Sequence, residues 1–228
     1  MTKQIKKAPV EYRHTAVAVD TVIFSVFNKS LHVLLTPVNR PPHYVSMKGF
    51  PGGLVDMNET AQEAVARTSK EKVGVSDFYF EQLYTFTDLE RDERNRVVSV
   101  AHLGLVPYAD VESMSRGEGV WVPVSEVEKL AYDHNEILEL APKRLAGKLL
   151  YTNIARHMLP KKFTLSELQG VYECVCGEVF DKRNFRKKIL SMNIVKDTGE
   201  LQTGMANRPA ALYQFTGRTV VEIPLIVA

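Results

Sequence analysis

The chain has 228 residues, of which 45% are hydrophobic and 25% charged, and a formal net charge of +2. This composition is that of an ordinary globular protein, so it excludes a disordered, collagen-like or coiled-coil chain, and the length allows one large or two small domains. No uncharged apolar run approaches the roughly 20 residues that span a membrane, and no secretory signal is visible at the N-terminus. We therefore expect a cytoplasmic protein with no membrane partner.

Charge is distributed unevenly along the chain. Residues 1–142 contain 15 Lys and Arg against 20 Asp and Glu, whereas residues 143–228 contain 14 against 7. A basic C-terminal part behind an acidic body indicates that the two parts meet different partners. A basic surface can be merely solvated, but nucleic-acid binding also requires one.

The two cysteines, Cys174 and Cys176, are separated by a single residue. A disulfide framework needs more cysteines than this, and a zinc site needs four ligands at suitable spacings. We expect neither a disulfide nor a bound metal.

The N-terminal part alternates between strands and helices. Runs of β-branched and aromatic residues predict strands over 15–27, 31–36, 78–87, 97–105 and 119–122. A helix is expected over 61–72, with Gly74 as its C-cap. A short helix should begin at Ser125, and a longer helical stretch over 135–159 should be kinked or restarted at Pro142.

Two connecting segments of this part carry turn signals. Residues 39–48, with Pro41 and Pro42, predict a loop. Residues 49–53 contain three glycines and predict a tight turn that uses positive φ angles.

The C-terminal part has a different organisation, and we place the domain boundary between residues 159 and 160. Thr164 and Glu167 form a capping box before a helix over 166–176, and Gly177 ends that helix. Asp181 caps a second helix over 182–192. Strands over 194–201 and 210–215 follow, with loops at 197–199 and 204–209. This order is typical of a winged helix-turn-helix.

The stretch from Gly53 to Val75 has the spacing of a Nudix box. Gly53, Glu59, Arg67, Glu71 and Gly74 occupy its fixed positions. The stretch resembles the Nudix signature, a loop–helix–loop that binds a diphosphate through divalent metal ions.

Two departures from this signature put hydrolysis in doubt. The signature has three glutamates at i, i+3 and i+4, a spacing that puts them on one helix face to hold Mg²⁺. Here the three positions are Thr68, Glu71 and Lys72, so one carboxylate of three remains. A lysine ammonium repels the metal, so we expect pyrophosphate hydrolysis to be lost or very weak. Lys72 and Arg67 could instead offset the charge of a diphosphate directly, in a site that binds its ligand and releases it unchanged.

A charged turn lies between two of the predicted strands. Residues 81–86 (EQLYTF) are followed by Asp88, Arg91, Asp92 and Arg94, and then by residues 97–101 (VVSVA). This segment resembles the corresponding one in Nudix-related transcriptional regulators. Arginines at a strand end can bind phosphate oxygens with two hydrogen bonds, although a solvated turn with internal Arg–Asp pairs is an equal alternative.

The second helix of the C-terminal part carries five cations within residues 181–188. Phe185, Ile189 and Met192 form an apolar stripe, so the cations occupy the other faces. A helix of this kind suits the DNA major groove. We expect DNA contacts from the following residues: Thr164, Lys182, Arg183, Asn184, Arg186, Lys187, Lys188 and, in the wing, Arg208.

The C-terminal part resembles the DNA-binding domain of the same regulators, so the resemblance extends from about Glu11 to Phe215. It implies an α+β chain, an α/β/α Nudix sandwich (1–159) followed by a winged helix-turn-helix domain (160–228). It also implies a homodimeric transcriptional regulator, in our reading a repressor of NAD metabolism, that binds a palindromic double-stranded DNA operator. ADP-ribose or a related nucleotide is the implied effector, with no cofactor required. We expect the effector at Arg40, Lys48, Glu59, Arg67, Glu71, Lys72, Arg91 and Arg94.

Three alternatives remain open. The first is an ADP-ribose or nucleoside-diphosphate-sugar pyrophosphatase with unusual ligands. The second is a regulator of the same family that responds to a sugar, because residues 39–48 depart from the aromatic-rich segment expected before Pro51. The third is a protein-binding adaptor. His134 could cap the following helix, which is our expectation, or line the effector pocket.

Overall fold

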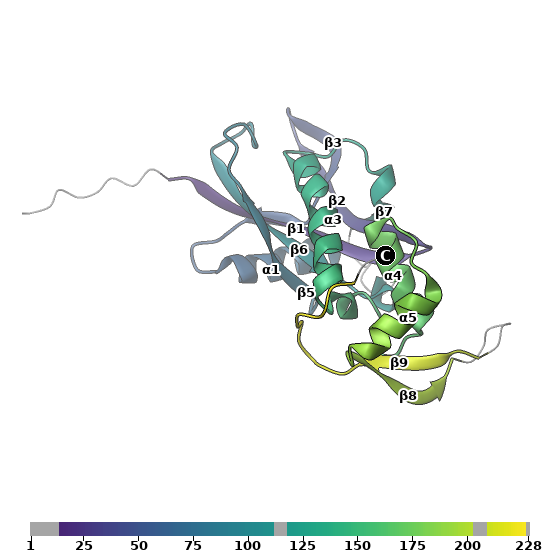
Figure 1. Cartoon of the computed structure of the whole chain (residues 1–228). Helices are drawn as coiled ribbons and strands as arrows, with labels where there is room; N and C mark the ends of the chain where they lie inside the picture. The colour runs from purple at the N-terminus through teal and green to yellow at the C-terminus, as the bar shows by residue number, and fades with distance from the viewer. Residues whose placement is uncertain (1–13, 112–117, 203–208, 227–228) are drawn as a thin grey trace, which may run out of the picture.

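The computed structural model describes residues 14–111, 118–202 and 209–226. Its N-terminal part is built on a seven-stranded mixed sheet in the order β3-β2-β1-β6-β5, with β4 paired to β1 and β7 paired to β2 (Figure 1). The two central strands, β1 and β6, run parallel. The strands are β1 (Ala16–Phe27), β2 (Ser30–Arg40), β3 (Tyr44–Gly49), β4 (Gly52–Leu54), β5 (Tyr79–Phe86), β6 (Val97–Leu105) and β7 (Val120–Pro123).

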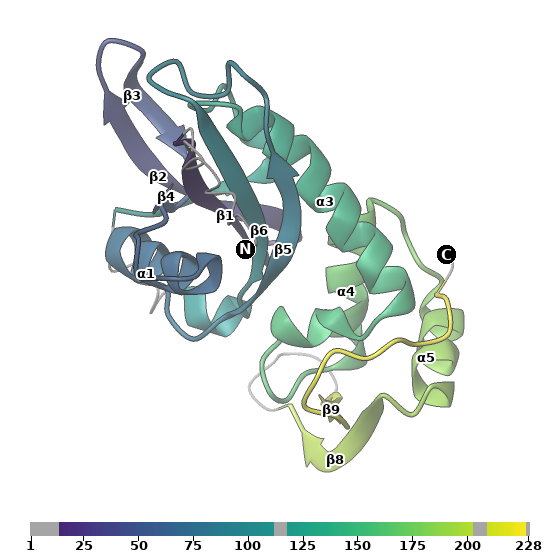
Figure 2. The same cartoon turned by 90° about the vertical axis from the view of Figure 1, so that its left-hand side faces the viewer.

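Helices cover both faces of this sheet. Alternate residues of β1 point to opposite faces, so Val19 packs with Ala64 and Val65 of α1 (Ala61–Val73). On the other face, Phe24 belongs to the same core as Ile137 of α3 (His134–Tyr151). Figure 2 shows α1 and α3 on either side of the sheet. The expected α/β/α sandwich is confirmed.

The loop predicted for residues 39–48 is wrong. Strands β2 and β3 form an antiparallel hairpin there, and Pro41 and Pro42 occupy only its turn. Tyr44 is buried and starts the returning strand. The two prolines correctly indicate a turn. The residues on either side of them are nevertheless free to form the β2–β3 ladder.

The glycines of residues 49–53 are needed for close approach rather than for positive φ. None of them has a positive φ angle. A Cβ on Gly52 would lie 2.3 Å from the carbonyl oxygen of Val19, so only glycine lets β4 pair with β1 here. The expectation of a left-handed turn is therefore wrong.

Helix α3 continues through Pro142 without a break, so the expected restart is wrong, whereas the alternative expectation of a kink stays a prediction. Its buried face, which includes Ile137, Ala141, Leu145 and Leu149, packs into the main core. This packing outweighs the loss of one backbone hydrogen bond at the proline. The helix ends at Tyr151, and short 3₁₀ turns occupy Tyr108–Asp110 (η1), Val124–Glu126 (η2) and Ile154–His157 (η3).

The C-terminal part is a winged helix-turn-helix, as predicted. It comprises α4 (Leu165–Cys176), α5 (Lys182–Ser191) and the hairpin of β8 (Val195–Leu201) and β9 (Ala211–Phe215). The capping box at Thr164, the left-handed Gly177 and the Asp181 cap are all present. The loop predicted at 197–199 lies inside β8, and most of the one predicted at 204–209 lies outside the described residues.

The two parts share one hydrophobic core. Leu145 and Leu149 of α3 belong to the same buried cluster as Leu168 of α4 and Phe185 of α5. Figure 2 shows the C-terminal segment, in yellow, leaving β9 and running past the end of α3. Ile223 and Ile226 of this segment donate backbone hydrogen bonds to Tyr151 and Leu150. The boundary at residues 159 and 160 stays a prediction.

Cys174 and Cys176 are free thiols, partly buried on α4. Within the described ranges, no helix is both long and apolar enough to cross a membrane.

Candidate ligand cavity and nucleic-acid interface

A cavity of about 960 Å³ opens beside the C-terminal half of α1. Its wall comes from β1, β2, β4, α1, the turn after β5 and the start of α3. The charged residues on this wall are four cations and four anions: Arg40, Lys72, Arg91 and Arg94, with Asp20, Glu71, Asp92 and Glu118. Phe50, Tyr132 and His134 add aromatic surface. The size and mixed lining suit a small polar ligand with an aromatic group.

A buried ionic network forms part of this wall. Arg91 donates from Nη2 to Asp20 Oδ2 at 3.1 Å and makes two hydrogen bonds to the carboxylate of Asp133. The Ser99 hydroxyl donates to Asp20 Oδ2 at 2.6 Å. Asp20 and Arg91 line the cavity, whereas Asp133 precedes the first residue of α3. The network therefore connects the cavity to that helix.

His134 lines the cavity, and it does not cap α3. Its Nδ1 accepts from the Phe50 backbone N–H at 3.0 Å, which leaves the proton on Nε2, 3.2 Å from Asp20 Oδ1. The expectation that His134 caps the helix is wrong. The ring is held on one side by Phe50, in the turn between β3 and β4, and on the other by Asp20 of β1, so it fixes the start of α3 against the sheet.

Burial and pairing act in opposite directions on the Asp20 carboxyl. Burial alone would raise its pKa, but His134, Arg91 and the Ser99 hydroxyl together hold the pKa well below its usual range. Asp20 is therefore a carboxylate at neutral pH.

Arg94 is the second arginine of the charged turn, and it is paired with Asp92. It donates to both carboxylate oxygens, at 2.9 and 2.8 Å, and this raises its pKa. Its guanidinium lies 5.4 Å from the centre of the Tyr132 ring. Both arginines thus make internal Arg–Asp pairs, and Arg91 is buried rather than solvated.

Tyr132 was not among the predicted site residues. It lies on the cavity wall with φ at 57°, a left-handed conformation that is rare for an aromatic residue. Its ring centre is 4.2 Å from that of Tyr44. Strained backbone of this kind concentrates at functional sites.

The predicted site residues of the Nudix box lie in two different places, some on the cavity wall and some away from it. Glu71 and Lys72 line the cavity. Arg67 instead donates to Glu59 from Nε at 3.0 Å and to the Leu54 carbonyl oxygen, and neither Arg67 nor Glu59 is on the cavity wall. The Arg67 hydrogen bond keeps the pKa of Glu59 below its usual range. Lys48 also lies off the wall, on β3.

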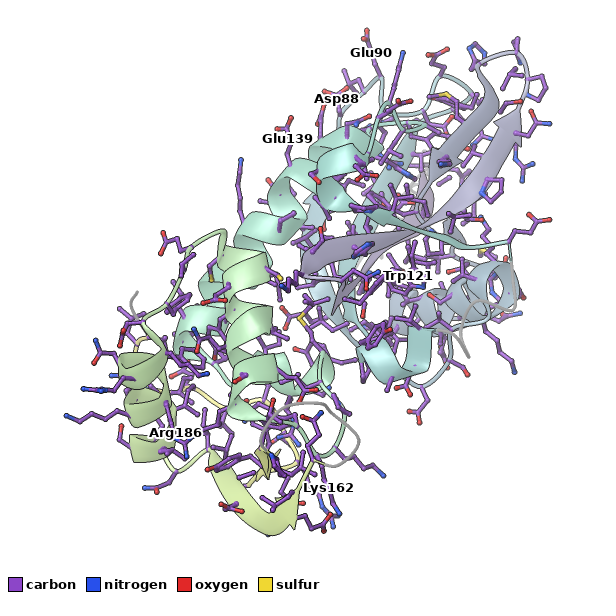
Figure 3. All side chains as sticks on the ribbon, turned by 90° about the vertical axis from the view of Figure 1, so that its right-hand side faces the viewer. Asp88, Glu90, Trp121, Glu139, Lys162 and Arg186 are labelled. Atoms are coloured by element: carbon purple, nitrogen blue, oxygen red, sulfur yellow. The ribbon has the colours of Figure 1, made fainter. Side chains whose placement is uncertain are left out.

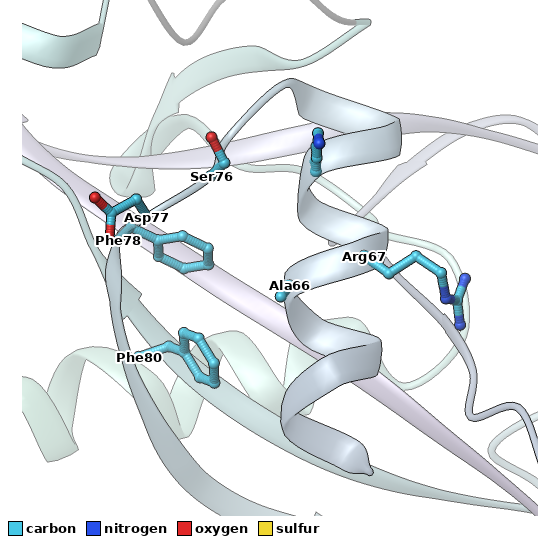
Figure 4. A pocket seen from close by; sticks show the side chains of 7 residues that line it. Ala66, Arg67, Ser76, Asp77, Phe78 and Phe80 are labelled. Atoms are coloured by element: carbon cyan, nitrogen blue, oxygen red, sulfur yellow. The ribbon is translucent and has the colours of Figure 1, made fainter. Parts of the chain in front are cut away.

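A smaller hollow of about 390 Å³ lies on the other side of α1. Figure 4 shows the rings of Phe78 and Phe80 facing α1, whereas the Arg67 side chain extends away from them. Phe78 and Phe80 make much of the lining apolar, and the charged residues on this wall are Arg67, Lys70 and Asp77, fewer than in the larger cavity.

The basic helix α5 presents its cations to solvent. Phe185 and Ile189 are buried against α4, and Lys182, Arg183, Asn184 and Lys187 are exposed. Asp181 accepts from the Asn184 backbone N–H at 2.8 Å and so fixes the first turn. Figure 3 shows Arg186 and Lys162 at the winged-helix end, far from the acidic Asp88, Glu90 and Glu139.

Two further predicted DNA contacts, exposed Arg186 and buried Thr164, also make hydrogen bonds within the domain. Arg186 donates to the Tyr213 hydroxyl at 3.3 Å, which joins α5 to the wing. Thr164 is buried, and its hydroxyl is engaged in the capping box with Glu167. Arg208 lies outside the described residues. Lys188, the remaining cation of α5, is half-buried.

A charged ligand cavity in an α/β/α sandwich, sharing one core with a winged helix whose basic helix faces solvent, defines a ligand-sensing DNA-binding regulator. Comparisons with known families agree. The NUDIX domain profile matches residues 16–141, and the profile of the NrtR DNA-binding winged helix domain matches residues 155–215. The chain belongs to the NrtR family of Nudix-related transcriptional regulators, as the sequence predicted.

Individual relatives support this assignment. The chain is 32% identical over 211 residues to the ADPR responsive transcriptional repressor NtrR of Acinetobacter baylyi, which covers 90% of this chain and 84% of that protein. Shewanella oneidensis NrtR, solved with a 27mer DNA, superposes with a TM-score of 0.79 and 33% identity, covering 88% and 93% of the two chains. The Nudix domain of the same protein, solved with ADP ribose, has a TM-score of 0.52 and 31% identity, covering 61% and 94%.

Proposed function

We propose that this protein represses genes of NAD metabolism and is released from its operator when ADP-ribose, or a closely related nucleotide diphosphate, fills the cavity. The observation that carries the proposal is the cavity itself, where cationic and aromatic side chains meet beside the Nudix-box helix. A relative described as ADPR responsive aligns with 90% of this chain, and a Nudix domain solved with ADP ribose aligns with 61% of it.

The DNA-binding form is a homodimer on a palindromic operator. A single α5 presents a short basic surface, and two copies related by a two-fold axis suit two half-sites about one helical turn apart. Exposed Lys182, Arg183 and Lys187 contact phosphates or base edges, and Arg186 supports the wing through Tyr213.

Helix α3 couples the two sites. Its first turn is held to the cavity wall through the Arg91–Asp133 pair and through His134. Its other end packs on α4, which in turn carries α5. A ligand that shifts Arg91 or His134 changes how α3 is seated and therefore how α5 is presented. Effector and operator then weaken each other to the same extent, as linkage requires.

The cavity binds its ligand without hydrolysing it. Thr68 and Lys72 replace two of the three glutamates of the Nudix signature, so the carboxylates that would hold a metal and activate water are missing. The protein thus acts as a sensor and not as a pyrophosphatase.

Fluorescence anisotropy of a labelled duplex from the protein's own upstream region tests this proposal. We expect tight binding that ADP-ribose reverses and that weakens steeply with salt. Tight binding that is indifferent to ADP-ribose would point to a sugar effector. Binding no better than to a scrambled duplex, together with Mg²⁺-dependent release of AMP from ADP-ribose, would contradict the regulator and favour the hydrolase.

A further inference from the structure

Two of the four cations on the cavity wall are neutralised by the protein itself. Arg91 is paired with Asp20 and Asp133, and Arg94 with Asp92. Among the described residues, Arg40 and Lys72 form no salt bridge. The positive charge available to a ligand therefore comes from Arg40 and Lys72.

The carboxylates of the Nudix box do not fit a divalent cation. Glu59 is held by Arg67 and by the Asp56 backbone N–H. Thr68 is buried, and its hydroxyl donates to the Ala64 carbonyl oxygen at 2.8 Å. Glu71 is the one carboxylate of the box on the cavity wall. Within the ranges that the structure describes, no three His, Cys, Asp or Glu side chains come together as a metal site.

Lys72 stands where the metal-binding face of the helix would be. It is adjacent to Glu71 in the sequence, and both side chains line the cavity. The lysine remains accessible, and the desolvation caused by its neighbours lowers its pKa. An ammonium at this point repels Mg²⁺ and attracts the oxygens of a diphosphate.

We propose that the cavity binds the diphosphate of its ligand directly, without a divalent cation, and that Lys72, assisted by Arg40, supplies the positive charge. This inference rests on the proposed effector function. It assigns Lys72 as a ligand-contacting and specificity-determining residue. The site takes a nucleoside diphosphate without a bound metal ion and discriminates against nucleoside monophosphates, which lack the second phosphate.

Isothermal titration of the full-length protein with ADP-ribose, in excess EDTA and in MgCl₂, tests the inference. We expect the same Kd in both buffers and at least tenfold weaker binding of AMP. K72M should weaken ADP-ribose binding by roughly 10–100-fold, the loss expected for a hydrogen-bonded charge. K70M is the matched control: Lys70 is exposed on the same helix, away from the cavity, and its loss should leave Kd unchanged.

K72E provides a second variant in which the charge is reversed. It places a carboxylate beside Glu71, so we expect weak binding in EDTA that Mg²⁺ partly restores. Binding of the unmodified protein only in MgCl₂, or K72M binding as tightly as K70M, would overturn the inference and leave the effector proposal intact. Failure to bind ADP-ribose in either buffer would overturn both.

Discussion

The guanidinium of Arg91 binds the carboxylate of Asp133 through two hydrogen bonds, Nε to Oδ2 at 2.9 Å and Nη2 to Oδ1 at 2.8 Å. These residues are 42 positions apart, one in the turn after β5 and the other directly before α3. Both side chains are almost fully buried. The pair thus attaches the helix that leads to the DNA-binding domain to a residue on the cavity wall.

The first prediction concerns the cost of breaking this pair. Arg91→Ala leaves Asp20 and Asp133 buried without their cation, and such losses cost about 3–5 kcal/mol. We expect the free energy of unfolding, measured in urea, to fall by that amount. Arg96→Ala is the matched control, because Arg96 makes one exposed hydrogen bond to the Asp88 carbonyl oxygen and should cost less than about 1 kcal/mol. Equal losses in the two variants would contradict a central role for Arg91.

The second prediction concerns the DNA surface. Arg183 is exposed on α5, so Arg183→Ala should leave the fold intact and weaken operator binding by about 1–3 kcal/mol, that is, roughly 5–150-fold. Lys143→Ala, on the exposed face of α3, changes the net charge equally and should have little effect. Anisotropy at several salt concentrations measures both. A loss for Lys143→Ala as large as that for Arg183→Ala would move the DNA surface away from α5.

The sequence predicted the winged helix nearly residue by residue, because its signals are local. Thr164 and Glu167 lie three positions apart, as do Asp181 and the N–H of Asn184 that it caps. Gly177 adopts the left-handed conformation that ends α4. Interactions within one helical turn depend little on the rest of the fold.

The cavity was only partly predictable, because its wall is assembled from distant segments. Asp20 and Arg91 are 71 positions apart. A single aspartate within the apolar strand 16–27 indicates that this carboxylate is buried and therefore paired. The sequence does not indicate which residue pairs with it. Tyr132 gave still less indication, since a left-handed tyrosine has no sequence signature, and for His134 the pocket was only the alternative to capping the helix.

The third prediction concerns the C-terminal segment after β9. Ile226 is 1% exposed and its backbone N–H donates to the Leu150 carbonyl oxygen at 2.8 Å. Ile226→Ala should cost about 2–4 kcal/mol of unfolding free energy through the cavity that it leaves. Leu225→Ala removes a side chain of the same size that is 57% exposed, and should cost much less. Similar values for the two variants would mean that this segment does not stabilise the junction with α3.

The last prediction concerns pH. The ring of His157 stacks on Tyr79 with centroids 4.2 Å apart, and burial, with a smaller contribution from Arg156, lowers the pKa of His157 from 6.5 to about 4. Between these two values the unfolded chain binds the proton more readily than the folded protein. The free energy of unfolding should therefore fall as the pH drops from 6.5 towards 4.

His157→Phe isolates this contribution, because phenylalanine keeps the stacked ring and cannot titrate. Between pH 7 and pH 5 the unmodified protein should lose about 1 kcal/mol more than the variant, after allowance for the partial exposure of the ring. Burial also lowers the pKa of His102, but that residue is common to both proteins and cancels in the comparison. Urea unfolding at the two pH values measures the difference, and parallel losses would show that His157 is protonated as easily in the folded protein as in the unfolded chain.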